Sequence, residues 1–319
     1  MKFGLFGLNM RPCVTREAIA AVAREAEGVG FESFWGGEHI ALPDPPTAST
    51  PMPPSTVFVD LCTTIAFAAA HTSKLRFGTG IMILPLRNPV VLAKQLASVD
   101  VLSGGRLIFG VGVGGENPKE FELCGVPHKE RGARVNEAID VVRTLWRDSP
   151  ATFHGRFTRF ESASIDPKPL QQPPPIWIGG RSDAALARAG RQGDGWMSYV
   201  VQADRYAQSL DKIRAAAAAA GRSMDKFTAA HLVFITIGRD YEAAKRAWVS
   251  VLSRRYAQDF EPLAKRYGVI GTPEQCAEQL ERFRAAGCNY FVMSAIGEPR
   301  DERAQLETIA AEIIPRFSR

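Results

Sequence analysis

The sequence predicts an α/β fold, a closed (β/α)8 barrel of the TIM type with insertions at its C-terminal face. Three observations support this prediction. Short apolar runs, typical of buried parallel strands, alternate with amphipathic helical segments along the chain. The alternation repeats eight times within 319 residues, a length in the usual range for such a barrel. No linker-like stretch divides the chain, so we expect residues 1–319 to form a single domain.

The expected strands are short apolar runs bounded by glycine, proline or polar residues. The first, KFGLFGL, and the last, NYFVMSA, are nearly continuous in apolar residues, as strands covered on both faces should be. The eight runs span residues 2–8, 31–39, 75–83, 106–114, 174–180, 193–200, 227–238 and 289–295.

The helices between these strands are predicted from apolar spacing and from capping signals. In the first helix, Ile19, Val22 and Ala26 recur at intervals of three and four residues. Pro89 suits a first helical position, and TPEQ at 272–275 is a capping box with Pro at that position. The expected helices span residues 15–29, 57–71, 89–102, 135–146, 182–191, 203–221, 241–257, 273–286 and 301–316.

Two insertions interrupt the alternation. Residues 41–56 hold six prolines and no periodicity, which predicts a loop long enough to be functional. We expect this loop to act as a lid over a substrate. Residues 151–165 alternate in the manner of a β-hairpin inserted between two units.

The stretch GVGVGG at 110–115 matches the G-x-G-x-x-G fingerprint of dinucleotide-binding Rossmann folds. The context contradicts that interpretation, because the match comes fourth in the alternation and Pro118 interrupts the segment after it. The region about twenty residues further on, where an acidic strand end is required, reads as helical. We therefore expect these glycines to keep the barrel mouth free of side chains, so that a flat ligand can approach the backbone.

Composition narrows the classes of function. The net charge is +5 and the pI about 9.0, but Lys and Arg alternate with Asp and Glu along the chain. This favours a solvated surface over a nucleic-acid interface. No apolar run is long enough to span a membrane, and the N-terminus reads as a strand, so we expect a cytoplasmic protein. The five cysteines and five histidines show no metal-binding spacing, and we expect no metal.

In a TIM barrel the chemistry lies at the C-terminal ends of the strands. Here those ends form a glycine-rich rim with few ionisable groups. They hold no carboxylate pair for glycoside hydrolysis, no Schiff-base lysine and no set of metal ligands. Such a rim suits an enzyme whose cofactor carries the reaction.

The stretch GGRSDAA at 179–185 is the best candidate anion site. Gly179 and Gly180 expose backbone N–H groups after a strand, and Ser182 is a natural helix N-cap. The following helix start offers further donors to a phosphate, and Arg181 can add a charged contact. The alternative is an ordinary strand-to-helix turn with a serine cap.

His39 is the one histidine at a strand end, directly after Glu38. It is suited to bind a cofactor ring or to donate a proton near neutral pH, and we take it as the candidate catalytic residue. Glu38 is included among the cofactor-binding candidates. The alternative for His39 is a side chain satisfied by local backbone.

The whole chain resembles the luciferase-like monooxygenase superfamily. The resemblance is carried by FESFWGGEHI, by LRFGTGIMILPLRNPVVLAKQLASVDVLSGGRLIFGVGVGG, by KERGAR and by PPPIWIGGRSDAALARAGRQGDGW. It is closest to the deazaflavin-dependent oxidoreductases. The resemblance implies a bacterial luciferase-like barrel that binds coenzyme F420 or FMN at its C-terminal mouth, and a homodimer.

The resemblance also assigns residues. It implies a non-prolyl cis peptide bond at Gly80–Ile81, behind the cofactor ring, and places His39 near that ring. Gly179, Gly180 and Ser182 match the family's cofactor-phosphate loop. It further implies that Asn9, Gly112 and Gly114 line the pocket.

The sequence departs from the family pattern after GVGVG, where Gly115 is followed by Glu116. The glutamate that acts as an acid in the sugar-phosphate dehydrogenase branch is therefore not cleanly matched, and the role of Glu116 is open. Arg131 and Arg134 either face an anionic ligand or form a salt bridge at a helix start.

The leading hypothesis is an F420-dependent oxidoreductase that transfers a hydride to or from a small organic substrate. The basic pI favours F420, whose tail carries several carboxylates. The alternative is an FMN-dependent two-component monooxygenase, which needs a flavin reductase as partner. From another class, a non-catalytic flavin-binding protein also fits. A nucleic-acid binder rests on charge alone.

Overall fold

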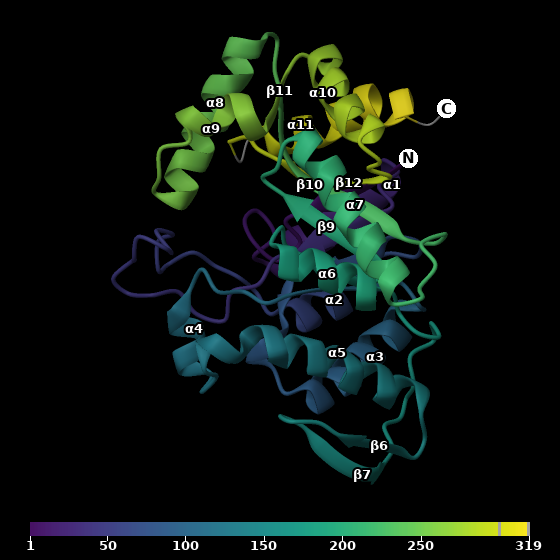
Figure 1. The fold of residues 1–319 in the computed structure, drawn as a ribbon. Coiled ribbons are helices and arrows are strands. Elements are labelled where there is room, and N and C mark those ends of the chain that lie inside the picture. The colour runs from purple at the N-terminus through teal and green to yellow at the C-terminus, as the bar shows by residue number, and fades with distance from the viewer. Residues whose placement is uncertain (299–300, 318–319) are drawn as a thin grey trace.

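The protein folds into a closed parallel barrel, as expected. The structure is a computed structural model, and it describes residues 1–298 and 301–317. Around the barrel, β12 is followed by β1, β2, β3 with β4, β5, β8, β9 and β10, and β10 pairs with β12 to close the circle. The bounds are Lys2–Phe6 (β1), Ser33–Gly36 (β2), Arg76–Thr79 (β3), Met82–Ile83 (β4), Leu107–Gly112 (β5), Ile176–Gly179 (β8), Gly195–Tyr199 (β9), Thr228–Ile237 (β10) and Tyr290–Ala295 (β12). Figure 1 shows the barrel with helices around it.

Two features of the sheet differ from the expectation. The third strand is split into β3 and β4, and both parts pair with β5. A further strand, β11 (Gly268–Gly271), pairs with the second half of β10, beyond the part that pairs with β9. This strand was missed because it has four residues, two of them glycine, and shows no periodicity of its own.

The helices largely follow the expected spans. Their bounds are Arg16–Gly28 (α1), Leu61–Ala69 (α2), Pro89–Ser103 (α3), Pro118–Leu123 (α4), Arg131–Arg147 (α5), Asp183–Gln192 (α6), Ala203–Ala219 (α7), Tyr241–Tyr256 (α8), Glu261–Tyr267 (α9), Pro273–Ala285 (α10) and Glu302–Thr308 (α11). The capping box at Thr272 is confirmed. The short helices α4 and α9 were not expected. Helix α2 begins four residues later than predicted, because Asp60 caps it.

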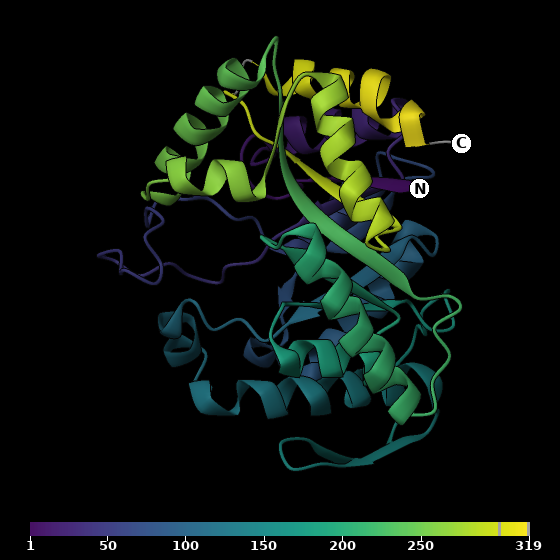
Figure 2. The ribbon, with the colours of Figure 1, turned by 45° about the horizontal axis from the view of Figure 1, so that its top comes forward.

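The two insertions occupy different places. The proline-rich segment lies on the side of the molecule where α4 and the ends of α8 and α9 are found (Figures 1 and 2). The hairpin is confirmed as β6 (Ala151–His154) and β7 (Arg159–Ala163). It lies outside the barrel along α5, not at the C-terminal face, because it follows a helix rather than a strand. Its tip returns to the start of α5, where Arg156 pairs with Glu130.

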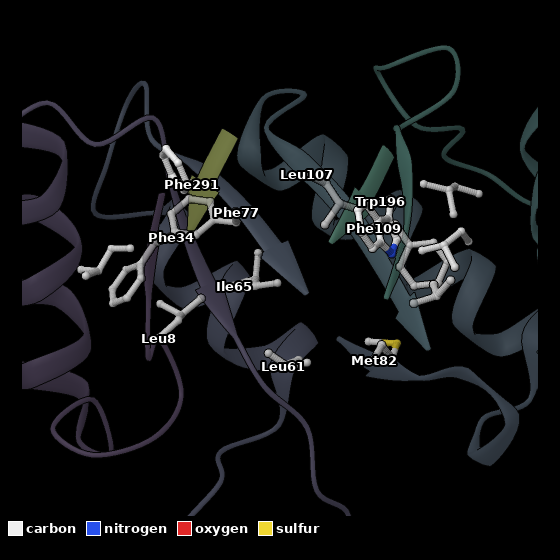
Figure 3. Close-up of a cluster of buried hydrophobic side chains, with 14 of the residues drawn as sticks. Leu8, Phe34, Leu61, Ile65, Phe77, Met82, Leu107, Phe109, Trp196 and Phe291 are labelled. Carbon is white, nitrogen blue, oxygen red and sulfur yellow. The ribbon is translucent and has the colours of Figure 1, made fainter. Parts of the chain in front are cut away.

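The core has an outer and an inner layer. The outer layer lies between the sheet and the helices and includes Phe34, Phe77 and Phe291 (Figure 3). The inner layer fills the barrel and consists of Trp35, Ile108, Trp177, Met197, Ala230, Tyr290 and Val292. Because the interior is filled, the barrel has a floor rather than a pore.

Two tryptophans dominate the inner layer. The rings of Trp35 and Trp177 lie 4.8 Å apart, and the indole N–H of Trp35 donates to the hydroxyl of Ser33 at 2.5 Å. The neighbouring strands make room with glycine. A Cβ atom on Gly78 would lie 2.1 Å from the Trp35 ring, and one on Gly195 would lie 2.6 Å from the Trp177 ring. These glycines are required for space.

Within the described residues, no helix combines the length and the apolar character needed to cross a membrane.

The interior packing predicts the effect of adding one methyl group. Gly78→Ala should lower the free energy of unfolding by about 1–3 kcal/mol, because the Trp35 ring has no free space to move into. Gly28→Ala is the matched control, since its Cβ would meet no described atom within 4 Å. Urea unfolding of both variants measures the difference. Equal midpoints for the two variants would contradict this account of the interior.

Candidate active site

The C-terminal ends of the strands carry a long segment, residues 37–60, that is held at both of its ends by Asn9. The Asn9 side-chain amide donates to the carbonyl of Gly37 at 2.8 Å and to that of Val59 at 2.7 Å. The N–H of Val59 donates back to the Asn9 carbonyl at 2.9 Å. The buried Oδ1 of Asn9 has no hydrogen-bond partner within the described residues. Asn9 therefore fixes the long segment and leaves one acceptor unsatisfied next to the mouth.

The Gly80–Ile81 peptide bond is cis, which confirms that expectation, and Ile81 follows it at the barrel mouth. The Ile81 side chain packs on the inner layer of the core. A Cβ atom on Gly112 would lie 1.8 Å from Ile81 Cδ1, and one on Gly179 would lie 2.7 Å from Ile81 Cγ2. Ile81 therefore forms an apolar platform at the top of the filled barrel.

This packing corrects our interpretation of the glycines in β5. We expected them to leave space for a flat ligand, but protein atoms occupy that space. Ile81 fills the place beside Gly112, and a Cβ on Gly110 would lie 1.9 Å from the carbonyl oxygen of Thr79. Gly114, with φ +60°, lies against Ile83. The glycines allow the split strand to approach β5, and a ligand would rest on Ile81.

Glu38 supports this platform from the side. One of its carboxylate oxygens accepts from the backbone N–H of Ile83 at 2.5 Å, and the other accepts from Nε of Arg87 at 3.0 Å. Arg87 also pairs with Asp60 at 3.0 Å. Burial raises the pKa of the Glu38 carboxyl, while the Arg87 guanidinium opposes that rise. Since both oxygens already have protein partners, this geometry favours a positioning role for Glu38.

His39 is oriented by a carboxylate that the sequence analysis missed. Nδ1 of His39 lies 3.3 Å from Oε2 of Glu120, and Oε1 of Glu120 accepts from the N–H of Ile40 at 2.5 Å. Only 1% of the Glu120 side chain is exposed, against 23% of His39. If Nδ1 carries the proton shared with Glu120, Nε2 is the nitrogen that can act on a ligand.

Helix α4 brings Glu120 to this position. Asn117 caps the helix, Pro118 takes its first position and Glu120 its third. The pattern is that of a capping box, which could have indicated the helix from sequence. The carboxylate instead reaches across to the segment after β2. The amide of Asn117 also donates to the Ala41 carbonyl at 2.7 Å, so α4 holds the start of the 37–60 segment.

The GGRS loop lies at the end of β8. Ser182 caps α6, since its hydroxyl accepts from the N–H of Ala185 at 3.3 Å, and Gly180 has φ +119°. Arg181 donates to the carbonyl of Val200 at 2.8 Å and lies over the ring of Tyr199, 5.1 Å from its centroid. The cap is compatible with a phosphate site and with a plain turn, and the phosphate role stays a prediction.

A tyrosine and a glutamate meet beside this loop. The hydroxyl of Tyr199 donates to Oε1 of Glu116 at 3.1 Å. Burial and the Glu116 carboxylate together raise the pKa of Tyr199 to about 12. Tyr199 therefore stays protonated at neutral pH, and Glu116 is occupied as its acceptor.

The two arginines of RGAR have partners in the protein. Arg134 pairs with Glu130 at 2.9 Å and lies over the Phe157 ring, 4.4 Å from its centroid. Arg131 donates to the carbonyl of His128 at 2.9 Å. The salt-bridge alternative is thus the observed one for Arg134. No group of three or more His, Cys, Asp or Glu residues suited to a metal ion occurs in the described part of the chain.

A family model described as luciferase-like monooxygenase matches residues 1–290. The chain belongs to the luciferase-like monooxygenase family. This confirms the resemblance inferred from the motifs, and it agrees with the closed barrel.

Curated relatives support the same family. An uncharacterized protein of Mycobacterium tuberculosis is 37% identical over 184 residues, which is 55% of this chain and 63% of that protein. The matched region thus spans less than two thirds of this relative. The F420-dependent glucose-6-phosphate dehydrogenase of Amycolatopsis mediterranei is 28% identical over 326 residues, 92% of each chain.

Solved structures share the fold. The monooxygenase RslO1 from Streptomyces bottropensis superposes with a TM-score of 0.85 at 23% identity, over the full length of both chains. An F420-dependent secondary alcohol dehydrogenase, solved with an F420-acetone adduct, gives a TM-score of 0.82 at 23% identity, over 100% of this chain and 99% of that one.

The contacts of Glu120 predict how firmly the start of the 37–60 segment is held. Glu120→Ala should speed amide hydrogen exchange at Ile40 and Ala41 by about tenfold or more, because their N–H groups lose a buried acceptor. Glu120→Gln keeps an acceptor oxygen and should restore most of the protection. Glu122→Ala, which removes an exposed partner of Lys119, is the control. Unchanged exchange in Glu120→Ala would show that the segment is held by other contacts.

Proposed function

We propose that the protein is an F420-dependent oxidoreductase that transfers a hydride to or from a small organic substrate. The proposal rests on the arrangement of two features at the barrel mouth. Ile81 forms an apolar platform above the filled barrel, and helix α6 begins on the rim beside it. A cofactor with a flat ring and a phosphate-bearing tail fits this arrangement, because the ring can lie on Ile81 and the phosphate at the start of α6. Relatives named as F420-dependent dehydrogenases support the choice of cofactor.

The residues present fit such a cofactor. Ile81 would support the ring, and the N–H groups at the start of α6, with Gly180 and Ser182, would bind the phosphate. The unsatisfied Oδ1 of Asn9 is an acceptor available to the ring edge or to the substrate. When bound, F420 supplies a ring carbon that accepts or donates a hydride.

The protein itself would handle the proton. Hydride transfer from an alcohol leaves a hydroxyl proton that must be removed, and the reverse reaction must return it. His39 Nε2 is the atom we assign to this task, since Nδ1 faces Glu120. Glu120 keeps the ring oriented and stabilises the imidazolium when the proton arrives. The 37–60 segment, held by Asn9 and α4, would exclude water.

Assembly and location are separate from the cofactor. We also propose that two copies associate, because α3 exposes Val91 (56%) and Leu102 (68%), which lie three helical turns apart on one face. A cytoplasmic location stays an expectation from the sequence. There are two alternatives to this function. One is an FMN-dependent monooxygenase with a separate reductase, and the other is a flavin-binding protein without turnover. The cofactor test below distinguishes them from the proposed function.

Cofactor titration tests the proposal directly. F420 and FMN are added separately to purified protein and followed by fluorescence, and F420 should bind at micromolar or lower concentration, with FMN weaker. Loaded protein is then given secondary alcohols and glucose 6-phosphate, and reduction of the deazaflavin is followed by absorbance. Tighter binding of FMN would indicate the monooxygenase, and bound F420 that no substrate reduces would favour a non-catalytic protein.

The phosphate loop can be tested without disturbing its helix cap. Ser182→Asp keeps a good N-cap and places a negative charge where the phosphate should lie, so F420 affinity should fall at least about tenfold. Ser182→Asn, a neutral cap of equal quality, should bind almost as tightly as the wild type. Equal F420 affinity of the Asp and Asn variants would place the phosphate elsewhere.

A further inference from the structure

A cavity of about 260 Å³ opens beside the barrel mouth, at the C-terminal ends of β1 and β12. Phe6 and Gly7 line it from the first strand and its exit, and Ser294 and Ala295 line it from the last. The loop after β1, which includes Arg11, and helices α1, α8 and α11 contribute most of the remaining walls. The cavity is large enough for the charged end of a small metabolite, and none of the contacts discussed for the cofactor uses it.

The charged residues around this cavity are mostly positive. Arg11, Arg255 and Arg303 line it, with Glu25 as the one acid among the lining residues that the structure describes. Glu25 is paired with Arg303, whose Nε lies 3.1 Å away. Among the side chains that the structure describes, no acidic partner of Arg11 or Arg255 is found. The described lining residues thus carry three positive charges against one negative charge, which favours an anion.

Ser294 adds a hydroxyl to the wall of the cavity. It is 4% exposed, lies at the end of β12 and lines the cavity. A bound anion would accept from this hydroxyl as well as from the two guanidinium groups.

The position of the cavity identifies which ligand carries the anion. Around the eight-membered barrel, β8 lies four strands from β1 in either direction. The loop assigned to the cofactor phosphate follows β8, so the cavity lies across the mouth from it. A ring resting on Ile81 would lie between the two places. The cavity is thus on the side of the ring opposite to the phosphate loop, where a substrate would extend.

We propose that the substrate of this enzyme carries an oxyanion group, a carboxylate or a phosphate, that Arg11, Arg255 and Ser294 bind in this cavity. The proposal rests on the proposed function for the position of the hydride transfer. Binding the charged group at β1 and β12 orients the other end of the substrate toward the ring platform and His39. Arginine suits this task, because its planar fork can hold two oxyanion oxygens at once.

Anion binding tests the proposal with two simple probes. Inorganic phosphate and succinate are titrated calorimetrically into F420-loaded protein at constant ionic strength. At least one should bind, and its Kd should rise about tenfold or more in Arg11→Gln and in Arg255→Gln. Arg254→Gln, which removes the neighbouring arginine that pairs with Glu298, should leave the Kd unchanged. The preferred probe distinguishes a phosphate ester from a carboxylic acid as substrate.

F420 titration of the same variants separates the possible failures. Unchanged F420 affinity with weakened phosphate or succinate binding supports the proposal. No binding of either probe to the wild type, or equal binding to all variants, overturns it. Weaker F420 binding in Arg255→Gln also overturns it, because the cavity would then hold the acidic tail of the cofactor. If F420 never binds but the probes still depend on Arg11 and Arg255, the anion site stands and the proposed function fails.

Discussion

The filling of the barrel by Trp35 and Trp177 is the constraint on which the rest of the structure depends. Two indole rings occupy the inner layer, and the strands around them can close only where the facing residue has no side chain. Gly78 and Gly195 meet that requirement, and Gly4 meets it beside Ser33. The indole N–H of Trp35 and the hydroxyl of Tyr290 both bond to the hydroxyl of Ser33, so these three polar groups are satisfied within the interior. The barrel interior is therefore filled by side chains, and the candidate site lies above it at the mouth.

At the mouth, as in the interior, a large side chain packs against glycine residues of neighbouring strands. Ile81 lies against Gly112 and Gly179, so the top of the barrel is apolar. The charged groups nearest this centre, Glu38 and Glu120, lie at the rim and are fixed by protein partners. Glu38 lies with Arg87 on one side and Glu120 with His39 on another. An apolar centre with oriented polar groups around it is the usual composition of a cofactor site.

Much of this could be predicted from the sequence, because each barrel strand and most helices have a local pattern. The eight barrel strands were predicted in order, and the motifs identified the family. What local patterns cannot show is contact between distant residues. Glu120 contacts the segment after β2, some eighty residues earlier, and nothing in its own helix indicates this. The glycines of β5 were predicted correctly as strand residues, but the role we gave them was wrong, because the side chain beside them comes from Ile81, between β3 and β4. Strand β11 was missed because its few residues are ordered by pairing with β10 and by packing under α8, not by periodicity.

The double attachment of the 37–60 segment to Asn9 has a consequence for how members of this fold diverge. Because one side chain holds both Gly37 and Val59, the ends of the segment stay together whatever lies between them. Doubling the length of a loop with fixed ends costs only about 0.6 kcal/mol of closure entropy. Residues between the two anchors can thus be replaced, lengthened or shortened at little cost to the barrel. If this segment covers the substrate, as we propose, its exchange would change substrate preference while the packed interior stays the same.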